Sequence, residues 1–120
     1  MDRRIIAAVD DMIFAAKIKG TAAAVGAEVE VVRSADAAVA AVERQPAALL
    51  IVDLHSEKCA PFELAARVKA DQKLAGVTLM GFFSHVNIEL RQRALATGFE
   101  QVLPRSAFVK RLGEILTGKF

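Results

Sequence analysis

The stretch AALLIVDLHSE, from Ala47 to Glu57, contains five successive apolar residues, Ala48 to Val52, that end at one carboxylate, Asp53. A short apolar run without alternation is typical of a strand that is covered on both faces, as in a parallel sheet. Polar residues follow the acid directly. The stretch therefore predicts a buried parallel strand with Asp53 at its carboxyl end, where open α/β sheets bind their ligands.

Four further apolar runs predict strands at Ile5 to Val9, Val29 to Val32, Val77 to Phe83 and Val102 to Leu103. Segments with helical spacing separate the runs, and cap residues mark their ends. The expected starts are Ser34, Pro61, Asn87 and Ser106, and the expected ends are Gly26, Gln45-Pro46, Gly98 and Gly118. The inward faces of the first and fourth helices are expected to include Val25 and Leu95, respectively.

Five strand–helix units with short connections predict an α/β fold, namely a doubly wound five-stranded parallel sheet. A chain of 120 residues, 54% hydrophobic, is long enough for one core. We therefore expect a single domain over residues 1–120.

Composition also excludes several classes of protein. No apolar run approaches the ~20 residues that span a bilayer, and a single cysteine, Cys59, cannot form an internal disulfide. A soluble, cytoplasmic protein is expected. The net charge of +2 is too small to predict nucleic-acid binding, although residues 87–120 hold six basic and three acidic side chains.

Polar residues follow the predicted strands at the edge where ligands bind. These are Asp10-Asp11, Asp53, Ser84-His85 and Pro104-Arg105-Ser106. Three carboxylates at one edge repel one another, and a hard divalent cation such as Mg²⁺ relieves that repulsion. An arginine nearby can pair with phosphoryl oxygens. As the simpler alternative, Asp10 and Asp11 only cap the first helix.

The motifs VDD at Val9 to Asp11 and IVDL at Ile51 to Leu54, with a basic residue after the fifth strand, resemble the receiver domain of two-component response regulators over essentially the whole chain. The resemblance implies a flavodoxin-like (βα)5 fold with strand order 2-1-3-4-5. It implies a signalling module rather than an enzyme, in which Asp53 accepts a phosphoryl group from a histidine kinase in a phosphorelay. It further implies Mg²⁺ bound by Asp10, Asp11, Asp53 and the backbone carbonyl of His55.

Three positions depart from the receiver pattern. Arg105 replaces the usual Lys, and we expect it either to contact the phosphate or to pair permanently with Asp53. Phe83 occupies the position of the usual Thr or Ser, so that Ser84 supplies a phosphate-contacting hydroxyl only after a shift of one residue. Val102 replaces the usual aromatic ring. The strings GFFSHV and VLPRSAF, at Gly81 to Val86 and Val102 to Phe108, resemble an atypical, free-standing subgroup of receiver-like proteins.

These departures leave two main functions open. In the first, the chain accepts a phosphoryl group at Asp53 with altered switching. In the second, it is a pseudo-receiver that binds a protein partner independently of phosphorylation, through a surface on the last two helices and last strand that carries Arg91, Arg93, Lys110 and Arg111. A flavin or nucleotide binder is disfavoured because no Gly-rich loop follows a strand. Monomer and homodimer both remain open.

Overall fold

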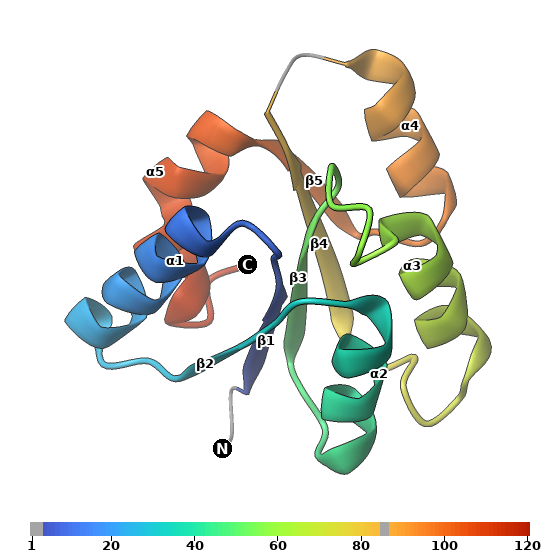
Figure 1. Cartoon of the computed structure of the whole chain (residues 1–120), viewed down its shortest axis with the longest axis horizontal. Helices are drawn as coiled ribbons and strands as arrows, with labels where there is room; N and C mark the ends of the chain where they lie inside the picture. Colours follow the sequence, from blue (N-terminus) through green and yellow to red (C-terminus); the bar gives the residue numbers. More distant parts are fainter. Residues whose placement is uncertain (1–3, 85–86) are drawn as a thin grey trace.

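The computed structural model describes residues 4–84 and 87–120, which form one five-stranded parallel sheet flanked by helices (Figure 1). The strand order is β2-β1-β3-β4-β5. The strands are β1 (Ile5–Ala8), β2 (Val29–Val32), β3 (Leu49–Asp53), β4 (Thr78–Phe83) and β5 (Gln101–Pro104). The helices are α1 (Met12–Val25), α2 (Ala35–Arg44), α3 (Pro61–Ala70), α4 (Ile88–Ala96) and α5 (Arg105–Leu116). The predicted fold class and strand order are confirmed.

The helices cover both faces of the sheet. Figure 1 shows α1 and α5 on one face and α2, α3 and α4 on the other. Each face has its own hydrophobic cluster, because successive side chains of a strand point to opposite sides. On β4, for example, Phe82 packs toward α1 and α5, whereas Phe83 packs toward the opposite helices. The continuous apolar run of β3 follows from this double coverage.

Most helix ends follow the predicted caps. The Ser34 and Asn87 hydroxyl and amide oxygens accept hydrogen bonds from the first turns of α2 and α4, and Gly26 ends α1 with a left-handed φ of 71°. The prediction that Ser106 caps the last helix was wrong. That helix begins at Arg105, so Ser106 lies within its first turn, and no side chain caps it.

Two apolar residues that were expected to face inward are exposed. Val25 is 38% exposed and Leu95 is 39% exposed. Both lie in the last turn of a helix, Val25 at the end of α1 and Leu95 next to the end of α4. The part of the chain that the structure describes contains no helix long and apolar enough to cross a membrane.

A charged network joins the start of β1 to β2 and α2. The carboxylate of Glu30 lies 2.7 Å from Arg4 Nη2 and 2.7 Å from Arg44 Nη2. Arg4 also donates to the carbonyl oxygens of Ala41 and Gln45. The hydrogen bond from Arg44, helped by Arg4 and opposed by desolvation, lowers the pKa of Glu30 below its ordinary value.

Replacing Glu30 by glutamine should lower the free energy of unfolding by about 1 kcal/mol at neutral pH, since the carboxylate is partly exposed and its ion pairs are screened. A group with a lowered pKa in the folded state stabilises above its unfolded pKa, and that contribution is lost as the pH falls through the folded pKa. The difference between wild type and E30Q should therefore shrink in acid. Urea unfolding across a pH series measures it.

Glu43→Gln is the matched control for this variant. Glu43 is exposed on the same helix as Arg44 and forms no ion pair within the described residues. Its replacement should leave stability nearly unchanged at every pH. A wild-type to E30Q difference that stays constant down to acidic pH would contradict the role of the network.

Candidate functional site

Three carboxylates lie at the carboxyl edge of the sheet. Asp10 and Asp11 follow β1, and Asp53 is the last residue of β3. The two strands are neighbours in the sheet, with Ala8 opposite Val52, so they end at the same level. We call Asp10, Asp11 and Asp53 the acidic edge.

Asp11 acts as the N-cap of α1. Its Oδ1 accepts hydrogen bonds from the backbone N–H groups of Ile13 at 2.9 Å and Phe14 at 3.1 Å. A carboxylate in this place satisfies two free donors and interacts favourably with the helix dipole. Asp11 therefore caps the first helix, and one of its two oxygens is occupied. Its part in a magnesium site stays a prediction.

Asp10 is paired with two cations. Arg33 Nε lies 3.2 Å from Asp10 Oδ1, and Lys58 Nζ lies 4.0 Å from the same oxygen. The fold places Arg33 there, because it directly follows β2, whose Val32 is paired with Ala8 of β1. The Asp10 side chain is 30% exposed, so water reaches this pair.

Asp53 is partly buried and holds the turn that follows β3. Its Oδ1 accepts a hydrogen bond from the backbone N–H of His55 at 2.9 Å. Within residues 4–84 and 87–120, its other carboxylate oxygen forms no hydrogen bond or ion pair. No described residue therefore engages that oxygen.

Arg105 lies against α1. Its guanidinium carbon is 4.1 Å from the centroid of the Phe14 ring, a cation–π contact, and its Nη2 is 3.9 Å from Asp11 Oδ2. Pairing with Asp53 was one of the two expectations for Arg105, and among the described residues its ion pair is with Asp11 instead. The side chains of Arg105 and Asp11 are 41% and 45% exposed, so this ion pair is weak.

The last residue of β4 is Phe83, at the position where a receiver usually has the hydroxyl of Thr or Ser. Phe83 is 4% exposed and belongs to the cluster under α2, α3 and α4. Ser84 is exposed, and its backbone N–H donates to Nε2 of His55 at 3.1 Å. His85 lies outside the described residues. Val102 of β5 is buried in the same cluster as Phe83.

A buried thiol lies close to the acidic edge. Cys59 is fully buried, and its backbone N–H donates to Ser56 Oγ at 3.2 Å. Burial raises the pKa of the thiol, the charges of Asp53 and Asp10 raise it further, and the hydrogen bond with Ser56 opposes them. Burial and these two charges therefore disfavour the thiolate, the form in which a cysteine acts as a nucleophile.

The donor chemistry of the acidic edge suits Mg²⁺, but the arrangement of the side chains does not. Each carboxylate is engaged with a cation or a backbone N–H group. Within residues 4–84 and 87–120, no group of three or more His, Cys, Asp and Glu side chains is placed to hold a metal ion. The magnesium site with Asp10, Asp11, Asp53 and the His55 carbonyl stays a prediction.

The four basic residues of the predicted partner surface are not equivalent. Arg93 of α4 lies over the ring of Phe62 of α3, with its guanidinium carbon 3.9 Å from the centroid, so it is directed toward α3. Arg91 and Lys110 are exposed, and Arg111 is half-buried. The side chains of these last three form no ion pair or hydrogen bond with any described residue.

The sequence analysis did not predict Arg33 and Lys58 as residues of the site, although both are ion-paired with Asp10. The rule that polar residues after a strand lie at the functional edge, applied to the second strand, would have identified Arg33. Lys58 has no such signal, since it lies five residues after Asp53 in the loop before α3.

No protein-family model matches the sequence, and no curated protein matches it significantly. Solved structures match it over nearly its whole length. A response regulator from Hahella chejuensis is 18% identical with a TM-score of 0.86, over 97% of this chain and 93% of that one.

Two further neighbours are response regulators with a modification or a metal. The phosphorylated cyanobacterial phytochrome response regulator RcpA is 20% identical with a TM-score of 0.81, over 98% of this chain and 91% of that one. The Mn²⁺-bound form of the response regulator Rcp1 is 15% identical with a TM-score of 0.79, over 98% and 94%. The chain therefore has the fold of the receiver domains of response regulators.

Proposed function

We propose that the chain is a cytoplasmic, receiver-like signal-transduction module in which Asp53 accepts a phosphoryl group. The observation that carries this proposal is the position of Asp53, which ends a central strand at the functional edge with one carboxylate oxygen unengaged by the described residues. The phosphorylated neighbour RcpA supports it by fold. A histidine kinase is the proposed upstream partner.

The reaction needs only one nucleophile from the protein. The free oxygen of Asp53 attacks the phosphorus of the donor, a P–O bond forms, and the bond between phosphorus and the donor's leaving group breaks. With acetyl phosphate as donor, acetate leaves with the electron pair and an acyl phosphate remains on Asp53. Arg105, held by Phe14 and Asp11, is the proposed phosphate contact, together with Ser84.

Incubation with acetyl phosphate and Mg²⁺, followed by intact-mass measurement, tests the proposal. Wild type should gain one phosphoryl group, and Asp53→Asn should gain none. Asp36→Asn is the matched control, since Asp36 is an exposed acid of α2 whose carboxylate pairs with Arg67 of α3, and it should behave as wild type. Absence of a mass increase in wild type above the D53N variant ends this version of the function.

The second candidate is a pseudo-receiver that binds a protein partner independently of phosphorylation. The specific observation in its favour is the paired state of Arg105, which lies against Phe14 and Asp11 rather than toward Asp53. Val102 and Phe83 are both buried, and Phe83 has no hydroxyl where a receiver has Thr or Ser, whereas Val102 has no ring where a receiver has an aromatic residue. Its proposed surface carries Arg91, Lys110 and Arg111, with Arg93 at its border.

Comparison of two variants with one captured partner separates the candidates. In the pseudo-receiver, binding should survive Asp53→Asn and fail in the charge-reversed variant K110E/R111E. Binding that is lost in D53N and kept in K110E/R111E favours the phosphorylated module instead.

A further inference from the structure

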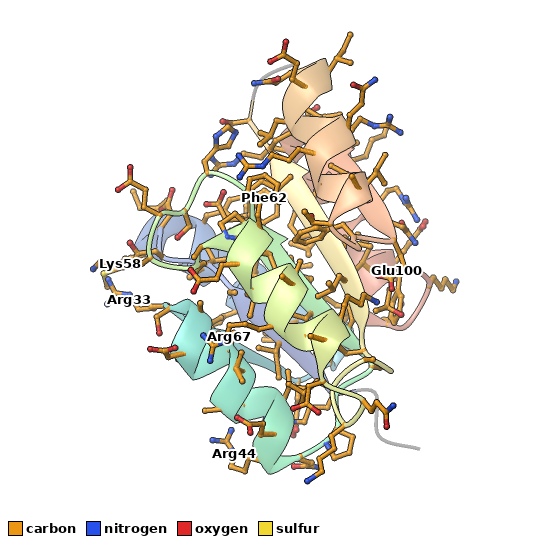
Figure 2. The ribbon with its side chains drawn as sticks, turned by 90° about the vertical axis from the view of Figure 1, so that its right-hand side faces the viewer. Arg33, Arg44, Lys58, Phe62, Arg67 and Glu100 are labelled. Carbon is orange, nitrogen blue, oxygen red and sulfur yellow. The ribbon has the colours of Figure 1, made fainter. Side chains whose placement is uncertain are left out.

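Two basic side chains from different loops meet at one oxygen of the acidic edge. Arg33 follows β2, and Lys58 lies in the loop between β3 and α3, yet both approach Asp10 Oδ1, at 3.2 Å and 4.0 Å. Figure 2 shows the two side chains next to each other beyond the start of α2. This convergence belongs to the tertiary structure and is not a local sequence feature.

Backbone hydrogen bonds fix the two loops from which these side chains extend. The carbonyl oxygen of Lys58 accepts a hydrogen bond from the backbone N–H of Ala35 at 3.1 Å, which fixes the loop against the first turn of α2. Ser34 caps that same turn through the N–H of Ala37. The backbone of Lys58 is therefore tied to the first residue of α2, two residues after Arg33.

Their position competes with a metal ion in two ways. They contact a carboxylate oxygen that a divalent cation at this edge would need as a ligand. They also place two positive charges beside this carboxylate, and these charges would repel a divalent cation that approaches it. The repulsion persists even when the contacts themselves are displaced.

We propose that Arg33 and Lys58 neutralise Asp10 in place of a divalent cation and thereby keep the acidic edge poor in metal. This would explain why the edge has carboxylates of the kind that bind Mg²⁺, while no group of three or more described His, Cys, Asp and Glu side chains is placed to hold a metal ion. This proposal rests on the proposed function only to the extent that both concern the acidic edge. Metal binding is measured without phosphorylation, so each proposal can fail while the other holds.

Isothermal titration with MnCl₂ at low ionic strength tests the proposal on the full chain. Arg33→Gln and Lys58→Met should each bind Mn²⁺ about tenfold more tightly than wild type, and the double variant should gain more than either, because each removes one charge that repels the ion. The further change Asp10→Asn in the double variant should abolish the gain.

Arg44→Gln is the matched control. Arg44 is 63% exposed and ion-paired, much as Arg33 is at 58%, but its partner is Glu30 and it lies at the other end of α2 (Figure 2). Its removal should leave the Mn²⁺ affinity within twofold of wild type. The proposal is overturned if R33Q/K58M binds no more tightly than R44Q, or if no Mn²⁺ binding is measurable in any variant. Circular dichroism confirms that each variant is folded.

Discussion

Replacing Phe82 by alanine is expected to lower the free energy of unfolding by about 3–5 kcal/mol. Phe82 is 2% exposed in the middle of the α1 and α5 side of the core. Its ring stacks on Phe108 at a centroid distance of 4.7 Å and lies 4.9 Å from Phe14. Alanine removes the buried ring and leaves a cavity that the sheet cannot close. Urea unfolding followed by circular dichroism measures the loss.

Two comparisons sharpen this expectation. Phe82→Leu keeps most of the buried volume and should cost clearly less than Phe82→Ala. Phe62→Ala is the exposed counterpart, because Phe62 is only partly buried against the other face, and it should also cost less. Equal losses for F82A and F62A would show that the ring cluster does not contribute as described.

Replacing Gly81 by alanine is expected to lower the free energy of unfolding by about 1–3 kcal/mol through overpacking. A Cβ atom at this position would lie 2.9 Å from Leu54 Cδ2 and 3.0 Å from Leu54 Cγ. Leu54 is 5% exposed and cannot move aside into solvent. Gly81 is therefore required in β4 because the residue after Asp53 fills the space above it.

A double-mutant cycle identifies the contact. Leu54→Ala alone should cost about 2–5 kcal/mol, but G81A in the L54A background should cost less than in wild type, because the clash is gone. Gly20→Ala is the control. It lies in α1 with nothing within 4 Å of an added Cβ, so it should be neutral or stabilise by about 0.5–1 kcal/mol. Additive costs for L54A and G81A would mean that the two residues do not clash.

The sequence was sufficient for the fold because each strand is marked by its own apolar run. The run from Ala48 to Val52 predicts β3 to within one residue at each end, and the caps Ser34 and Asn87 locate two helix starts. The strand order was predicted from the family resemblance, since the local sequence of five similar βα units does not indicate which strands are neighbours in the sheet. The start of the last helix was predicted wrongly at Ser106, because a serine inside the first turn of a helix has the same sequence pattern as a serine that caps it.

The site was predicted only where it depends on strand ends. Asp10, Asp11 and Asp53 are brought to one edge by the sheet alone. What each carboxylate binds depends on long-range geometry that no local pattern contains. The contact of Lys58 with Asp10 occurs together with the hydrogen bond between Ala35 and Lys58, and Arg105 reaches Asp11 while it lies over the ring of Phe14.

The alternation of Phe82 and Phe83 limits how this chain can acquire a switch hydroxyl. Moving Ser84 into the place of Phe83 by a one-residue slip of β4 would exchange the faces of both rings and break both halves of the core. A threonine at position 83 would instead remove one ring from the α2, α3 and α4 side alone. A hydroxyl at position 83 therefore needs a point substitution together with a larger residue nearby that fills the lost volume. An insertion or deletion in β4 would not provide it, because it would disrupt both faces of the core.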